Sequence, residues 1–259
     1  MLLSTYVVFI TDSDSASGKA AIRRFIAEGA HFLLNSESGG AALSAELKLV
    51  EESGKQAIVV NIDLCKHADV MDMLQYAEQQ IGTVTTLVHN SKVVLPSSIE
   101  YADEEQFSQS IAVNAKSAFI CTQAAGKLMK EKQAGTIIYV SSIHAEKPTG
   151  SAFTYSIAKG AVNMLAKEAA LVLGRFGIRV NTIETGPIEG DSQLFDSTIS
   201  TLYNDYEYKV PNAVLGTQED LAELIYFLSS DASTYINGAD IRLDGGFLLH
   251  YMNVKMKKP

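Results

Sequence analysis

The chain has 259 residues, a length that a single α/β domain can reach. Its 47% of hydrophobic and 20% of charged residues exclude disorder as the main state, and 18 glycines with 5 prolines exclude collagen-like and low-complexity proteins. The net charge of −9 disfavours nucleic acid and anionic membrane surfaces as partners. No uncharged apolar run reaches the length of about 18 residues that a membrane span needs, so we expect no membrane-spanning segment.

Two cysteines, Cys65 and Cys121, are too few for a disulfide framework, and both follow apolar or helical patterns that favour reduced packing residues. Residues 1–5 lack the basic and apolar pattern of a secretion signal. The five histidines have no metal-ligand spacing, so no metal site is expected. Together these features predict a cytoplasmic protein without a metal ion.

Short apolar runs alternate with helical patterns along the whole chain. The runs that read as strands are 6–10, 31–34, 57–60, 86–88, 136–140, 179–183 and 240–243. The patterns that read as helices are 20–28, 41–53, 70–80, 104–129 with small interruptions, 153–173 and 218–228. This alternation predicts one α/β domain over 1–259, with a doubly wound sheet of about seven parallel strands and helices on both faces. Ligands of such sheets bind beyond the carboxyl ends of the strands.

Two segments depart from this regular alternation. Residues 189–212 are polar and irregular, and loops of that length are usually functional, so we expect a substrate loop there. Its tyrosines, at 203, 206 and 208, predict either a lid over the substrate or a helix face packed on the core. The C-terminal tail, 247–259, is expected to extend across a neighbouring subunit.

Three polar residues form the clearest chemical pattern. Tyr155 and Lys159 are four residues apart, so they share one face of a helix, and Ser142 follows a strand 13 residues before Tyr155. A free tyrosine has a pKa of about 10, too high for efficient proton transfer at neutral pH. A nearby ammonium lowers that pKa, and a hydroxyl can orient a carbonyl oxygen. The pattern therefore predicts a proton donor, its electrostatic partner and a substrate clamp.

These residues belong to a longer series of motifs. The series comprises Thr11 to Gly18, Asp63-Leu64, His89-Asn90-Ser91-Lys92, Asn114, Ser141-Ser142, Tyr155 to Lys159, Arg179-Val180-Asn181, Gly186-Pro187-Ile188 and Leu243 to Gly246. With these motifs the chain resembles the short-chain dehydrogenase/reductase family over nearly its whole length. The resemblance implies a Rossmann-type fold and an oxidoreductase that interconverts a carbonyl and an alcohol with NAD or NADP. It also implies that Asn114 completes a catalytic tetrad with Ser142, Tyr155 and Lys159.

The resemblance further assigns a set of dinucleotide-binding positions. These are Ser13, Ser17, Gly18, Ser36, Asp63, Leu64, Asn90, Tyr155, Lys159 and Ile188. Glu37, at the end of the second strand, would repel a 2′-phosphate, so NAD is favoured over NADP.

The first turn departs from the family pattern T-G-x-x-x-G-x-G. Asp12 and Ala16 replace two of its glycines, and only Gly18 remains. The turn serves to bring backbone amides and a helix N-terminus close to a pyrophosphate, and a carboxylate there opposes that contact. Alternatively, the carboxylates turn to solvent while the serine hydroxyls serve the phosphates. Lys92, which replaces a glycine, either compensates Asp12 or is simply solvated.

Three hypotheses therefore follow from the sequence. The first is an NAD(P)-dependent oxidoreductase in which Tyr155 exchanges the proton. The second is a cofactor-poor family member that acts as a binding or regulatory subunit. The third, a cofactor-independent lyase or dehalogenase, is disfavoured because such relatives are expected to carry arginine in place of Lys159.

Family resemblance also implies a homotetramer or homodimer and a small carbonyl or alcohol substrate. Apolar helix positions support such an assembly, although they fit a packed face on the sheet equally well. These positions are Ala118, Phe119, Ala161 and Leu165.

Overall fold

The structure, a computed structural model, describes residues 6–189, 210–211 and 213–249. Its strands are β1 (Val7–Ile10), β2 (His31–Asn35), β3 (Ala57–Val60), β4 (Thr86–His89), β5 (Gly135–Ser142), β6 (Ile178–Thr185) and β7 (Asp240–Leu243). Its main helices are α1 (Ala16–Ile26), α2 (Ser44–Glu52), α3 (His67–Ile81), α4 (Glu104–Ile111), α5 (Ser117–Lys132), α6 (Phe153–Leu173) and α7 (Gln218–Ser229). A π-helical turn, Ala112–Lys116, joins α4 to α5.

The strands form one parallel sheet in the order β3-β2-β1-β4-β5-β6-β7. The chain builds outward from β1 to β3 and then crosses back to β4, so the strand order reverses between β1 and β4. A crevice opens at such a point beyond the carboxyl ends of the strands. The predicted doubly wound sheet is confirmed.

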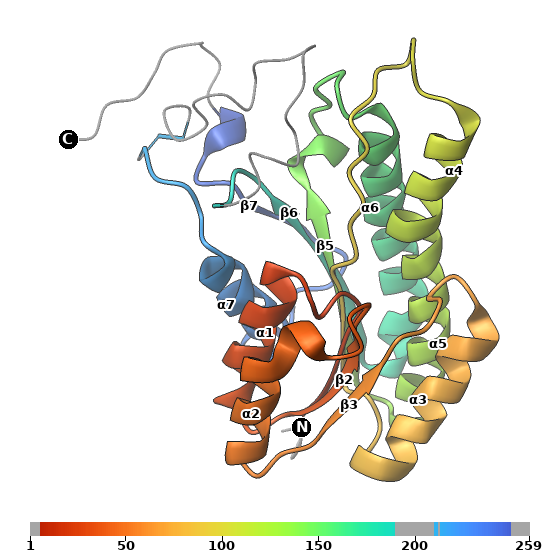
Figure 1. The fold of residues 1–259 in the computed structure, drawn as a ribbon, viewed down its shortest axis with the longest axis vertical. Coiled ribbons are helices and arrows are strands. Elements are labelled where there is room, and N and C mark those ends of the chain that lie inside the picture. Colours follow the sequence, from red (N-terminus) through yellow and green to blue (C-terminus); the bar gives the residue numbers. More distant parts are fainter. Residues whose placement is uncertain (1–5, 190–209, 212, 250–259) are drawn as a thin grey trace.

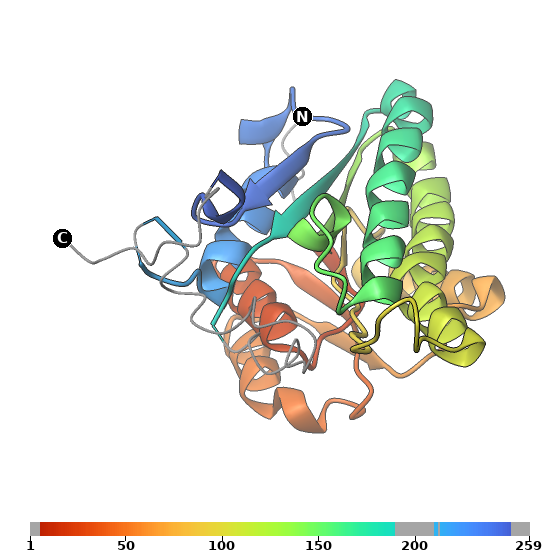
Figure 2. The ribbon, with the colours of Figure 1, turned by 90° about the horizontal axis from the view of Figure 1, so that it is seen from above.

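Side chains of each strand alternate between the two faces of the sheet. Val7 and Phe9 of β1 pack with α3, α5 and α6, whereas Val8 and Ile10 pack with α1, α2 and α7. Figure 1 shows the sheet between these two groups of helices, and Figure 2 shows the same layers from above. Because both faces are covered, β1, β4 and β5 are buried along their whole length. Among the described helices, none is long and apolar enough to cross a membrane.

The predicted elements agree with the observed ones except at some ends. Helix α1 begins at Ala16 rather than near residue 20, because the Ser15 hydroxyl accepts a hydrogen bond from the Gly18 amide and caps the helix. Strand β5 runs on to Ser142, so this serine is the last residue of a buried strand. Residues 190–209 and 212, with the three tyrosines of the expected substrate loop, lie outside the described residues, as do 250–259 of the tail.

Candidate active site

The turn after β1 keeps a close backbone approach at Gly18 although two glycines are missing. A Cβ on Gly18 would lie 2.2 Å from the backbone oxygen of Asp12, so only glycine fits at that position. Among the described residues other than glycine, only Gln133 and Ala213 have positive φ angles. Asp12 and Ala16 therefore occupy backbone conformations that any L-residue adopts, and their substitution introduces no backbone strain.

The hydroxyl groups of this turn bind one another and the turn itself. Ser13 is fully buried, and its Oγ donates to the backbone oxygen of Ile10 at 3.2 Å. Ser17 Oγ lies 3.1 Å from Ser15 Oγ and accepts a hydrogen bond from Asn90 Nδ2 at 3.1 Å. The side chain of Asn90, which follows β4, thus forms hydrogen bonds with the turn. Of the two serines predicted to bind phosphate, Ser17 is the more accessible.

A second acidic residue of the turn, Asp14, fastens it to the end of β2. Its Oδ1 accepts from Ser36 Oγ at 2.7 Å, and its Oδ2 accepts from the backbone amide of Ser38 at 2.8 Å. Partial burial alone would raise the pKa of Asp14, but the hydrogen bonds from Ser38 and Ser36 outweigh it and lower the pKa. Ser36 is itself fully buried and also accepts from the Gly40 amide at 2.8 Å. Its hydroxyl is therefore engaged within the loop rather than presented to a ligand.

A cleft of about 360 Å³ opens at the point where the strand order reverses. Its lining comes from the segments at the carboxyl ends of β1 to β4, from the π-helical turn and from the first residue of α5. The lining residues are Thr11, Asp12, Asn35, Glu37, Asn61, Ile62, Asp63, Leu64, Cys65, Ser91, Lys92, Val93, Val113 and Ser117. Asp63 and Leu64, two of the predicted dinucleotide-binding residues, thus line this cleft.

The carboxyl group of Asp12 is the unusual feature of this cleft. Burial raises the pKa of Asp12, and the nearby charges of Asp14 and Glu37 raise it further. The Ser15 amide and the charge of Lys92 act in the opposite direction without reversing the shift. Compensation of Asp12 by Lys92, one of the two alternatives that the sequence left open, stays a prediction.

Tyr155 and Lys159 lie one turn apart on α6, beside the end of β5. Both are buried, and Lys159 Nζ lies 5.5 Å from the centre of the Tyr155 ring. The ammonium donates to the backbone oxygen of Val140 at 2.9 Å and to that of Ser91 at 3.4 Å. These contacts hold the Lys159 ammonium between β5, the segment after β4 and the Tyr155 ring. The structure therefore brings together the lysine and the tyrosine that the sequence paired.

Burial lowers the pKa of Lys159 to about 7, and the charge of Lys92 contributes to the shift. A lysine with such a pKa can gain or lose a proton near neutral pH. Perturbed lysines of this kind are characteristic of active sites.

Asn114 lies in the π-helical turn between α4 and α5. Its Oδ1 accepts from the Val93 amide at 3.1 Å, and its Nδ2 donates to the backbone oxygens of Val93 and Ser110, both at 2.9 Å. The side chain thereby holds the segment after β4 against the helices. Single π-helical turns within helices are frequent at functional sites. The sequence indicated an interruption in this helical stretch but did not indicate its kind.

The remaining predicted position, Ile188, follows β6. It is buried and forms an isolated bridge with Gly216, whose amide donates to Pro187 O at 3.1 Å. Sequence reasoning missed two backbone contributions, the oxygens of Val140 and Ser91 that bind Lys159. No side-chain pattern could have revealed them, because backbone groups carry no sequence signal.

Comparisons with known proteins agree with this architecture. The family model described as "Enoyl-(Acyl carrier protein) reductase" matches residues 13–248. Glucose 1-dehydrogenase 2 of Bacillus subtilis is 28% identical over 96% of this chain and 96% of its own. L-rhamnose 1-dehydrogenase (NAD(P)(+)) of Azotobacter vinelandii is 30% identical over 96% of this chain and 99% of its own. The crystal structure of a short-chain type dehydrogenase/reductase from Mycobacterium marinum superposes with a TM-score of 0.83, at 26% identity, over 93% of this chain and 94% of that one.

Proposed function

The chain belongs to the short-chain dehydrogenase/reductase family, and we propose that it interconverts a small carbonyl compound and its alcohol with a nicotinamide dinucleotide. The observation that carries this proposal is the placement of Ser142, Tyr155 and Lys159 together at the carboxyl end of β5.

The three side chains have distinct roles in the proposed reaction. The dinucleotide, when bound, supplies or accepts the hydride at the carbonyl carbon. The Tyr155 phenol gives its proton to the substrate oxygen during reduction and takes it back during oxidation. The Lys159 ammonium stabilises the phenolate relative to the phenol and so assists proton transfer from Tyr155. The Ser142 hydroxyl binds the substrate oxygen and so orients the carbonyl.

The observed residues fit most of a dinucleotide site. Gly18 leaves the close approach that a Cβ would fill, and Ser17 and the N-terminus of α1 lie at the same turn. Asp63 and Leu64 line the cleft at the end of β3 and are the residues proposed to hold the adenine end. Asn90 keeps the turn in shape and is proposed to act indirectly. Asp12 opposes binding because its carboxylate shares the cleft with the phosphates.

Glu37 supports a preference for NAD over NADP. Glu37 lines the cleft at the end of β2, where a 2′-phosphate would bring negative charge close to the Glu37 carboxylate. Of the described lining residues, Lys92 alone is cationic, and it follows β4 rather than β2. A carboxylate near the ribose accepts a hydrogen bond from a 2′-hydroxyl, so the same residue favours NAD.

A second candidate function follows from Asp12. If its carboxylate excludes the dinucleotide, the chain is a binding or regulatory member of the family rather than an enzyme. A panel of aldoses, hydroxysteroid ketones and small diketones, assayed with NADH and NADPH by absorbance, distinguishes the two. Turnover that Tyr155→Phe abolishes supports the enzyme. No turnover and no binding of either dinucleotide by wild type, with binding restored in Asp12→Gly, supports the binding subunit.

Exposed apolar residues on α6 support self-association. Ile157, Met164 and Leu171 are spaced by seven residues and are 40%, 58% and 79% exposed, so they form one stripe along the helix. On α5, Phe119 is 47% exposed, whereas Ala118 is fully buried and faces the sheet. We therefore propose a dimer or tetramer in which α5 and α6 meet their mates across a two-fold axis. A monomeric sedimentation profile at micromolar concentration would exclude it.

The two cysteines support a reducing compartment. Cys65 and Cys121 are both free thiols, and Cys121 is fully buried. We propose the cytoplasm on this ground.

A further inference from the structure

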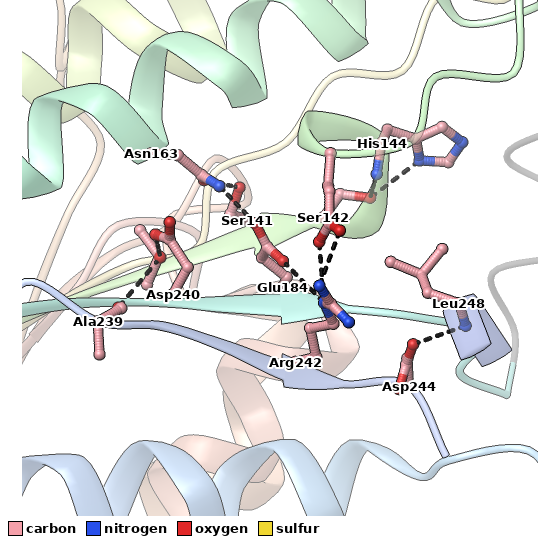
Figure 3. A network of polar contacts seen from close by, with 12 residues as sticks. Ser141, Ser142, His144, Asn163, Glu184, Ala239, Asp240, Arg242, Asp244 and Leu248 are labelled. Atoms are coloured by element: carbon pink, nitrogen blue, oxygen red, sulfur yellow. Dashed lines mark hydrogen bonds and ion pairs between the residues drawn. The ribbon is translucent and has the colours of Figure 1, made fainter. Parts of the chain in front are cut away.

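His144 lies two residues beyond Ser142 and contacts its hydroxyl directly. His144 Nδ1 lies 2.9 Å from Ser142 Oγ, and the backbone amide of His144 donates to the same oxygen at 3.3 Å (Figure 3). Both side chains are buried, at 3% and 4% exposure. The contact follows from a short 3₁₀ turn, Ile143–Ala145, which Ser142 caps.

The same imidazole ring also contacts Tyr155. The two ring centres are 5.7 Å apart with an interplanar angle of 70°, an edge-to-face arrangement. Burial lowers the pKa of His144 to about 4, so the ring is neutral at neutral pH. One uncharged ring therefore touches two residues to which the proposed reaction assigns roles.

The hydrogen bonds at Ser142 Oγ restrict where its proton can point. A serine hydroxyl has one donor hydrogen and two acceptor lone pairs. The backbone amide of His144 occupies one lone pair. If Nδ1 carries the ring proton, it occupies the other lone pair, and the hydroxyl hydrogen must point to a third group. If Nδ1 carries no proton, the Ser142 hydroxyl donates its only hydrogen to Nδ1.

Only the first arrangement allows Ser142 to donate to a carbonyl oxygen, which can accept hydrogen bonds but cannot give them. We propose that His144 is a positioning residue, held as the Nδ1–H tautomer, that aims the Ser142 hydroxyl hydrogen at the substrate oxygen. This inference rests on the proposed function for the role of Ser142, but the tautomer itself is a property of the protein without substrate.

The tautomer is measured first, so that the test does not depend on activity. The full chain is labelled with ¹⁵N-histidine, and long-range ¹H–¹⁵N correlation spectra report which ring nitrogen is protonated. Comparison with His144→Asn assigns the signals. The proposal requires that Nδ1 carries the proton at neutral pH and that Ser142→Ala weakens this preference. A dominant Nε2–H tautomer in wild type would overturn it.

Two isosteric variants then test the consequence for the reaction. Asparagine places an amide near the position of Nδ1, whereas leucine has the same shape and no hydrogen-bonding group. His144→Leu should lower kcat for carbonyl reduction about tenfold, the loss of one hydrogen bond, while His144→Asn stays within about threefold. The KM for the dinucleotide should not change in either.

The outcomes separate this inference from the proposed function. Equal kcat values for the leucine and asparagine variants, both folded by circular dichroism, would show that the hydrogen bond does not act in catalysis. If no carbonyl compound is turned over at all, the proposed function fails, and the ¹⁵N spectra still decide the tautomer.

Discussion

The side-chain amide of Asn90 binds both backbone polar groups of Asp12. Its Oδ1 accepts from the Asp12 amide at 2.9 Å, and its Nδ2 donates to the Asp12 carbonyl at 2.8 Å. The Asn90 side chain, just after β4, thus forms the pair of hydrogen bonds with the Asp12 backbone that a neighbouring strand would otherwise form. This relationship explains how the turn keeps its shape when a glycine becomes aspartate.

Asn90→Leu should destabilise the turn, because it leaves the part-buried backbone amide of Asp12 without its partner and removes one of the two hydrogen bonds to the Asp12 carbonyl, which keeps that from Ser15 Oγ at 2.8 Å. An unsatisfied amide costs about 1–3 kcal/mol, which for a chain of this size lowers Tm by about 3 °C or more. Differential scanning calorimetry measures the shift. Asn61→Ala, which removes an exposed hydrogen bond from Asn61 Nδ2 to the Glu37 oxygen, serves as the control and should change Tm by less than about 2 °C. A wild-type Tm for Asn90→Leu would contradict the proposed role.

Asp12→Asn should strengthen dinucleotide binding at neutral pH by at least about tenfold, because it removes a carboxylate from the cleft. The pKa of Asp12 is raised, so its charge is lost at a higher pH than that of an ordinary aspartate. Wild-type affinity for NADH should therefore rise as pH falls from 7 toward 5, whereas the affinity of Asp12→Asn should change less. Isothermal titration across this range tests both statements. Equal affinities of the two proteins at pH 7 would show that the carboxylate does not face the ligand.

Lys159→Met should abolish turnover and yet stabilise the protein without ligand. The pKa of Lys159 is about 7 in the folded state, below the ordinary value of 10.5. The unfolded chain therefore binds more protons between these values, and the buried charge costs most stability below pH 7. The Tm of the variant should exceed that of wild type by several degrees at pH 6, and the difference should shrink as pH rises toward 9.5. A difference that grows with pH would contradict this assignment.

Glu37→Arg should shift cofactor preference from NADH toward NADPH. The substitution replaces a carboxylate by a cation that pairs with a 2′-phosphate. We expect the ratio of the two dissociation constants to change by at least about tenfold, measured by fluorescence titration. Glu37→Gln separates the loss of repulsion from the gain of an ion pair. An unchanged ratio in both variants would place the discriminating contact elsewhere.

The sequence predicted the fold almost completely, because short apolar-rich runs alternate with helical patterns along the chain. Ala57–Val60 and Asp240–Leu243 were predicted to the residue, as was helix Phe153–Leu173. The start of α1 was missed, because its first turn is polar and is stabilised by the Ser15 cap rather than by packing. The hydrophobic periodicity of a sequence indicates which residues are buried. It does not indicate a helix end that is determined by a capping side chain.

The candidate site was predicted less fully. The sequence indicated Ser142, Tyr155 and Lys159, and the family resemblance implied Asn114 through its position. The burial of Ser13 and Ser36 depends on long-range hydrogen bonds, such as that between Asp14 and Ser36 across 22 residues of chain, which no local pattern reveals. Whether these residues bind a dinucleotide remains a prediction.

Binding of a nicotinamide dinucleotide to the unmodified chain tests the central claim most directly. Isothermal titration of wild type with NADH, beside NADPH and beside the Asp12→Gly variant, is the measurement. The account predicts saturable binding of NADH at one site per chain, with a micromolar Kd, weaker binding of NADPH, and tighter binding of NADH by Asp12→Gly. No saturable binding of either dinucleotide, by wild type and by the variant alike, would contradict the account and leave a family fold that has lost its cofactor.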